Sequence, residues 1–231
     1  MNTKDSELIR NRAILTYLDN LSLRALIQMI PHIGGSIDIL LAGKGAKIQQ
    51  ARLESFLDSL SARVKEIEDS ANTTFQISQD EELYDFILAT FSDVVKTKEK
   101  IKRDRFSALL ASQIMRPRDW SDAGCAERIL AALDDIHIKV LLEAASAPEG
   151  VGVWKGVCPI SLFEADDSPM RDTSYLQHWL PEYPLSMLRL ACAELLAKGL
   201  LQDEGVGRLS IRAMTYFVIT DLGLWFIDWL S

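Results

Sequence analysis

The sequence has few of the residues from which metal sites and disulfide frameworks are built. It contains 3 cysteines, which lie far apart, and 3 histidines in three separate segments. An odd number of widely spaced cysteines does not fit a set of disulfide bridges and is typical of a reducing compartment. No histidines or cysteines have the spacing of a zinc-binding motif. We therefore expect no metal site and no disulfide framework.

Motifs of the common enzyme classes are missing as well. Gly150, Gly152 and Gly156 are one residue too far apart for a dinucleotide-binding loop, and Gly43–Gly45 lacks the rest of a phosphate-binding loop. No serine lies in a nucleophile motif. Adjacent acids such as Asp134–Asp135 point to different sides of a helix and are expected on the surface. The sequence predicts no catalytic residue, no cofactor and no enzyme.

An apolar leader is also missing, because residues 1–7 are mostly polar, and we expect a cytoplasmic protein. Residues 21–42 approach the length of a membrane span, but Arg24 and Asp38 lie within this stretch and Pro31 interrupts it. Charges near the centre of a bilayer cost a few kcal/mol each. We interpret residues 21–42 as two short buried helical pieces. The alternative is a membrane-active effector that inserts them.

An excess of positive charge is absent too. The chain has 25 Lys and Arg against 33 Asp and Glu, a net charge of -8. Residues 127–231 carry fifteen acids and eight bases, whereas residues 1–126 carry eighteen acids and seventeen bases. This charge balance argues against electrostatic binding of nucleic acid by the chain, and most strongly against binding by the second half.

What the first half does contain is apolar residues at helical spacing. One coiled-coil-like seam, which Phe56 widens, consists of Leu53, Leu57, Leu60, Val64 and Ile67. A second stripe consists of Leu83, Phe86, Ile87, Phe91, Val94 and Val95. A third helical pattern, which Pro117 ends, holds Phe106, Leu109, Leu110 and Ile114. We expect antiparallel helical hairpins that form a bundle over residues 1–120.

The second half, residues 121–231, follows a linker predicted at residues 116–124. A helix at Ala126–Ala147 and a loop come first, and Gly199 then stops a strong helix at Leu185–Lys198. Next come a hairpin of Leu200–Gln202 with Leu209–Arg212, a third strand at Thr215–Thr220, and a helix at Asp221–Leu230 that Thr220 caps.

This order of elements resembles a winged helix-turn-helix domain. The resemblance is carried by Leu195–Leu201 (LLAKGLL), where the third helix runs into the wing, and by Phe217–Phe226 (FVITDLGLWF). It implies a mainly α fold: an N-terminal helical bundle, then a winged-helix-like α+β module with a short β-hairpin or a three-stranded wing.

The N-terminal half resembles a group of small bacterial proteins whose nearest named relatives are the abortive-infection alpha-type proteins. The residues concerned are Ile30–Asp38 (IPHIGGSID), Arg52–Leu57 (RLESFL) and Lys98–Phe106 (KEKIKRDRF). The resemblance implies a role in bacterial stress or phage defence.

A basic run interrupts the otherwise acidic sequence at Lys96–Arg105, with six bases and two acids in ten residues. On one continuous helix, Lys98, Lys102 and Arg105 share a face. One interpretation is contact with phosphate or an anionic lipid surface through Lys96, Lys98, Lys102, Arg103 and Arg105. The other is a solvated helical face or a hairpin turn.

The helix that would read DNA in a winged helix, Leu185–Lys198, offers only Arg189 and Lys198 as bases, and the wing tip is Asp203–Glu204. Reading of the major groove needs cationic or amide side chains on this helix, and acids on the wing repel phosphate. A DNA-binding regulator is therefore an alternative, and a non-enzymatic adaptor or sensor that acts through protein contacts is the leading hypothesis.

The last helix is apolar around most of its circumference. Leu222, Trp225, Phe226 and Trp229 share one face, whereas Leu224 and Ile227 lie outside it and need a second surface. We expect a dimer contact or tight packing between domains, made by Leu224, Trp225, Ile227 and Trp229. The predicted partner is another protein or a second copy of the chain, with a homodimer favoured.

Overall fold

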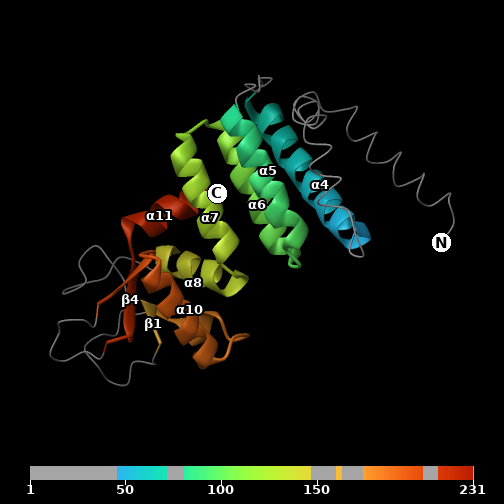
Figure 1. Cartoon of the computed structure of the whole chain (residues 1–231). Coiled ribbons are helices and arrows are strands. Elements are labelled where there is room, and N and C mark those ends of the chain that lie inside the picture. Colours follow the sequence, from blue (N-terminus) through green and yellow to red (C-terminus); the bar gives the residue numbers. More distant parts are fainter. Residues whose placement is uncertain (1–45, 72–80, 147–159, 163–173, 205–212, 231) are drawn as a thin grey trace. The chain divides into compact units, whose positions relative to one another are not determined.

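The computed structural model describes five stretches of the chain, which are mainly helical and include a small sheet (Figure 1). The described residues are 46–71, 81–146, 160–162, 174–204 and 213–230. Contacts divide the chain between Ala132 and Leu133 into an N-terminal unit with helices α4 to α7 and a C-terminal unit with α8 to α11 and the sheet. No helix among the described residues is long and apolar enough to cross a membrane. The stretch 21–42 and the expected strand Leu209–Arg212 lie outside the described residues.

The N-terminal unit is a set of packed helices. Helix α4 contacts both α5 and α6, and α7 packs on α5 and α6 (Figure 1). Their bounds are α4 Ala46–Ala71, α5 Glu81–Lys96, α6 Lys100–Met115 and α7 Trp120–Ala132.

The core of this unit follows the predicted stripes closely. All six apolar residues predicted for the buried face of α5 are buried. On α4, Leu53, Phe56, Leu60 and Val64 are buried, and Phe56 meets Phe91 of α5 edge to face with ring centroids 5.6 Å apart. Leu57 is only half-buried, so the predicted seam is displaced toward Phe56.

The junction between the two halves differs from the prediction. The expected linker at residues 116–124 contains the start of α7, and the expected helix Ala126–Ala147 is two helices, α7 and α8 (Asp135–Ser146). The chain divides after α7 rather than before it. The break between α7 and α8 lies at Asp134, whose carbonyl accepts a hydrogen bond from the His137 amide (3.1 Å), as at the start of a helix.

The C-terminal unit contains a sheet in which strands remote in sequence are neighbours. Strand β4 lies between β1 and β3 and runs antiparallel to both, and the short β2 pairs in parallel with β1. Phe217 of β4 pairs with Ile160 on one side and with Asp203 on the other. The elements are α8, β1 Ile160–Ser161, β2 Ser174–Tyr175, α9 Leu176–Trp179, α10 Leu185–Ala197, β3 Leu201–Asp203, β4 Tyr216–Ile219 and α11 Asp221–Asp228.

Strand β3 pairs with β4, the stretch expected as a third strand. The predicted hairpin partner Leu209–Arg212 lies outside the described residues, so the hairpin stays a prediction. Within the turn before β4, the Met214 amide donates to the Asp203 carboxylate over 2.6 Å, and Met214 has a positive φ of 60°. The buried Asp203 therefore holds the chain where it enters β4 and does not form an exposed acidic tip.

Two predicted helix ends of this unit are confirmed. Helix α10 ends at Ala197, and Gly199 follows with a φ of 72°, which glycine adopts without strain. The Thr220 hydroxyl donates to the Gly199 carbonyl (2.7 Å) and accepts from the Gly223 amide (3.0 Å). Thr220 therefore caps α11 and also ties the start of this helix to the end of α10.

Helix α11 buries fewer of its apolar residues than the sequence indicated. Phe226 and Trp229 are fully buried, and Trp225 is half-buried with its ring 6.1 Å from that of Trp229. Leu222, expected on the buried face, is 40% exposed, and Leu224 is 48% exposed. The buried face of α11 includes Gly223, which packs closely against the backbone of Leu200. An added Cβ at Gly223 would lie 2.5 Å from the Leu200 carbonyl oxygen.

Candidate functional site

Cationic side chains close the C-terminal end of α5. Arg103 donates to the carbonyl oxygens of Lys98 (2.7 Å) and Thr97 (3.2 Å), and Arg52 of α4 donates to the carbonyl of Val95 (2.8 Å). The last carbonyls of a helix have no partner inside the helix and carry partial negative charge. The Arg52 guanidinium satisfies such carbonyls at the end of α5, and the Arg103 guanidinium binds the carbonyls of the turn between α5 and α6.

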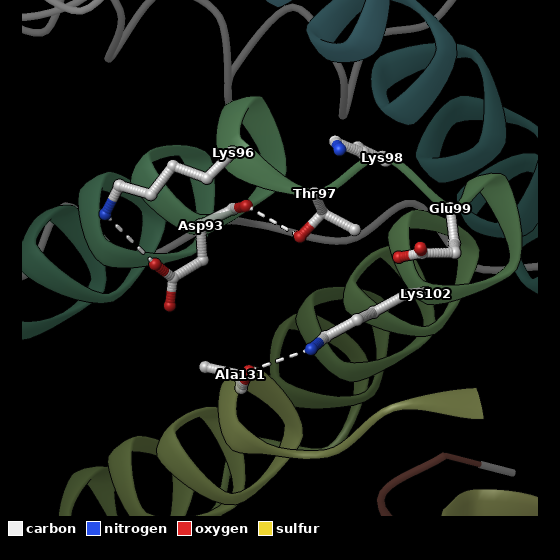
Figure 2. Close-up of a pocket in the computed structure, with 7 residues that line it drawn as sticks. All are labelled: Asp93, Lys96, Thr97, Lys98, Glu99, Lys102 and Ala131. Atoms are coloured by element: carbon white, nitrogen blue, oxygen red, sulfur yellow. Dashed lines mark hydrogen bonds and ion pairs between the residues drawn. The ribbon is translucent and has the colours of Figure 1, made fainter. Parts of the chain in front are cut away.

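Lys102 binds a carbonyl near the C-terminal end of another helix, α7. Its ammonium donates to the carbonyl of Ala131, near the end of α7, over 2.8 Å, and the residue is nine-tenths buried (Figure 2). The first turn of α6 is thereby joined to the last turn of α7. An ammonium has three N–H donors, and this contact uses one of them.

Beside these contacts lies a cleft of about 340 Å³, formed by the end of α5, the turn that follows, the start of α6 and the end of α7. Figure 2 shows the ammonium groups of Lys96, Lys98 and Lys102 and the carboxylates of Asp93 and Glu99 around it. Lys96 forms an ion pair with Asp93 over 3.3 Å. The Lys98 side chain is exposed and makes no hydrogen bond or ion pair to another residue within the described stretches. Apart from Ala131, the lining residues are polar or charged.

Behind Asp93 lies a second carboxyl group that sequence reasoning did not single out. Glu127 of α7 is only 6% exposed, among the buried residues Ala123, Ala126 and Leu130. Burial, together with a hydrogen bond to Asp93 and the negative charge of Asp93, raises the pKa of Glu127 to about 7. The pair therefore holds a proton near neutral pH. The only sequence signal was an acid on the apolar face of a helix.

The basic run is thus divided between two roles. Lys102 and Arg103 are buried: Lys102 binds the Ala131 carbonyl at the end of α7, and Arg103 binds the Lys98 carbonyl in the turn after α5, so neither lies on a solvated helical face. Lys98 precedes α6 and does not share a helical face with Lys102, and Arg105 is half-buried. Lys96 and Lys98 are exposed at the cleft, where the predicted contact with an anionic group stays a prediction.

In the C-terminal unit, a histidine joins α8 to α10. His137 Nδ1 accepts a hydrogen bond from the Asp134 amide (3.0 Å), and Nε2 lies 2.7 Å from the Glu194 carboxylate. Because Nδ1 is an acceptor, the proton of the neutral ring lies on Nε2 and is donated to Glu194. This arrangement is that of a capping box, in which the fourth residue of the motif binds the amide of the first. We assign His137 a structural role.

A second polar cluster holds α8 to the turn before α10. The Lys139 ammonium binds Glu182 (3.0 Å), Asp135 (3.1 Å) and the Tyr183 hydroxyl (3.3 Å). Tyr183 in turn donates to Asp135 over 3.1 Å. These hydrogen bonds, Glu182 first, raise the pKa of Lys139 above its ordinary value. The lysine is therefore a fixed cation that orients the turn and is no candidate proton donor.

The outer face of α10 is apolar and accessible. Met187 is 44% exposed and Leu190 is 50% exposed, while Leu188, Cys192 and Leu195 on the opposite face are buried. On the adjacent α9, Trp179 is 59% exposed. Three large exposed apolar residues of the described C-terminal unit therefore lie on two consecutive helices, α9 and α10. The sequence indicated a strong helix here but gave no reason to expect its accessible side to be apolar.

The described residues give no arrangement for metal binding, and the thiol of Cys192 is inert. No group of three or more His, Cys, Asp or Glu side chains in this part of the chain is placed to hold a metal ion. Cys192 is buried, and burial raises the pKa of its thiol to about 12, so the thiol stays protonated and inert.

Comparison with known proteins adds no relative. The chain matches no protein-family model, no curated protein sequence and no solved structure. The function is therefore inferred from the surfaces and contacts described above.

Proposed function

We propose that the chain is a non-enzymatic adaptor or sensor whose C-terminal unit is a winged-helix module used for protein contact. The order α8, β1, α9, α10, β3, β4, with β4 between β1 and β3, supports the winged-helix interpretation. In this arrangement α10 corresponds to the helix that DNA-binding members place in the major groove.

The exposed side chains of α10 carry the proposal. Major-groove reading requires a helix whose accessible face has arginine, lysine, asparagine or glutamine. The accessible face of α10 has Met187 and Leu190 at its centre, with Arg189 beside them. Exposed apolar residues grouped on one helix face mark sites of protein contact. A protein partner matches this face better than a phosphate backbone does.

The partner that fits is a second copy of the chain. Met187 and Leu190 are both exposed on the accessible side of α10. When two copies of this helix pack antiparallel about a twofold axis that passes near Leu190, the two copies of Leu190 lie against each other and the apolar face of each helix is covered. The face is thus complementary to itself in apolar character.

The test is the oligomeric state of the full chain, measured by light scattering coupled to size exclusion. We expect a dimeric parent and a monomeric Leu190→Glu variant. Leu224→Glu, on α11, is the matched control, because Leu224 is 48% exposed against 50% for Leu190 and lies in the same unit. Circular dichroism checks that both variants are folded.

Two results would contradict the proposal. A parent that stays monomeric at high concentration would remove self-association as the function of this face. A dimer that only Leu224→Glu dissociates would transfer the interface to α11, where the sequence placed it through Leu224, Trp225, Ile227 and Trp229.

The proposal includes the setting that the N-terminal resemblance implies, which is bacterial stress or phage defence. If assembly through α10 serves that role, cells that produce the chain should resist phage better than cells that produce Leu190→Glu. Plating efficiency measures the difference. Equal plating on both strains would separate this face from any defence role.

A further inference from the structure

The first turn of α6 carries cationic side chains and no acidic one. Lys100, Lys102 and Arg103 lie within or next to that turn. Glu99 at the N-cap position makes no side-chain hydrogen bond to the helix. The free amides of a helix start carry partial positive charge, so nearby cations are unfavourable there and an anion is favourable. This charge lacks a compensating anion within the turn.

Three of the nearby cations have evident roles, and one does not. Lys102 binds the Ala131 carbonyl at the end of α7, Arg103 binds the Lys98 carbonyl in the turn before α6, and Lys100 pairs with Asp104 over 2.7 Å. The Lys98 ammonium makes no hydrogen bond or ion pair to any other described residue, and Lys98 lines the cleft (Figure 2). This ammonium is therefore available to an anion bound at the helix start beside it.

We infer that the cleft binds a phosphate monoester, with the phosphoryl group held by Lys98, Lys102 and the start of α6. Lys102 has two further N–H donors besides the one bound to Ala131, and its buried stem fixes where they lie. Charge-assisted hydrogen bonds from two ammonium groups and a helix start are the usual means of holding phosphate.

The other lining residues indicate what the phosphate is attached to. The cleft of about 340 Å³ is larger than a phosphate ion and has the size of a small-molecule site. Asp93 and Glu99 supply carboxylates, which accept hydrogen bonds and would repel a second anionic group. The ligand is therefore a polyol phosphate, whose hydroxyl groups donate to these carboxylates. Such a group occurs in soluble sugar phosphates and in inositol phosphate headgroups of lipids.

The first experiment uses glucose 6-phosphate and the full chain, with glucose and inorganic phosphate as comparisons at constant ionic strength. Calorimetry measures affinity, and two-dimensional NMR follows the amides of Lys98–Lys102. We expect saturable binding of glucose 6-phosphate with shifts of these amides, weaker binding of phosphate and none of glucose.

Variants test the assigned residues. Lys98→Gln should weaken binding about tenfold or more, because it removes a charge-assisted contact. Lys100→Gln is the matched control: it removes the same charge two residues away, but Lys100 pairs with Asp104 and does not line the cleft. Its affinity should stay within about twofold of the parent. Lys98 is exposed and unpaired, so its replacement does not remove a structural contact.

A second arm distinguishes the source of the phosphate monoester. Sedimentation with phosphatidylcholine vesicles that carry phosphatidylinositol 4-phosphate tests the lipid headgroup. Binding to these vesicles but not to glucose 6-phosphate, lost in Lys98→Gln alone, assigns the site to a headgroup. Binding to glucose 6-phosphate assigns it to a soluble ligand. Failure of both ligands to bind, or an equal loss in Lys98→Gln and Lys100→Gln, overturns the inference.

Discussion

Replacement of Glu127 by glutamine should make the chain more stable at alkaline pH and leave it nearly unchanged in acid. Folding raises the pKa of this buried carboxyl from 4.5 to about 7, first through burial and then through Asp93. Between these two values the folded chain binds more protons than the unfolded chain does. The contribution of Glu127 to the free energy of unfolding therefore falls as the pH rises through this interval, and it is constant above it.

The magnitude follows from the two pKa values. Each pH unit between them corresponds to about 1.4 kcal/mol, so the ionised carboxylate costs the folded chain about 3 kcal/mol at pH 8. Glutamine has the shape of the protonated form, carries no charge and still donates a hydrogen bond to Asp93. The stability gained by Glu127→Gln should thus grow by about 2 to 3 kcal/mol between pH 5 and pH 8.

Urea unfolding, followed by circular dichroism at a series of pH values, measures this difference. Asp58→Asn, which neutralises an exposed carboxylate on α4, is the control and should shift stability by the same small amount at every pH. NMR titration of the Glu127 carboxyl carbon reports its pKa directly. A stability difference between parent and Glu127→Gln that does not change with pH would refute the account of a buried, proton-sharing pair.

Two further predictions concern packing. Leu60 is fully buried on α4, so Leu60→Ala should cost about 2–5 kcal/mol, and an unchanged melting temperature would show that the stripe is not a core. Two helical glycines should respond oppositely to alanine. Gly124→Ala on α7 should stabilise by up to about 1 kcal/mol, because the added Cβ meets only Arg128 at 3.4 Å. Gly223→Ala should destabilise the C-terminal unit, because its Cβ would lie 2.5 Å from the Leu200 carbonyl. Thermal melts of both variants test this, and equal shifts of the two melting temperatures would contradict the prediction.

Local patterns were sufficient to predict elements whose apolar residues point one way. The stripe of α5 was predicted in full, and so were the end of α10 at Gly199 and the Thr220 cap, because each depends on residues within one or two turns. The break before α8 also had a local signal. Asp134 followed by His137 is a helix start, yet the adjacent acids were interpreted only as surface.

The features that sequence reasoning missed depend on partners far away in the chain. Lys102 was grouped with the basic run because nothing near it in the sequence indicates the Ala131 carbonyl of α7, and Glu127 was not singled out because its partner Asp93 lies on another helix. The sequence predicted strands at the positions of β3 and β4 but not that the two pair with each other. Periodicity reports which side of an element is apolar and does not report which element covers it.

The central place of β4 sets the order in which the chain folds during synthesis. In the N-terminal unit, α5 and α6 are consecutive and meet across a short turn, so their contacts form as soon as both have been made. In the C-terminal unit, Ile160 has no cross-strand partner in β4 until Phe217 has been translated, and Phe226 and Trp229 follow later still. Closing a long loop before its contacts exist is slow. The helices of the N-terminal unit therefore pack while the second half is still being synthesised, whereas α8 and β1 lack their contacts to β4 until nearly the whole chain has been made.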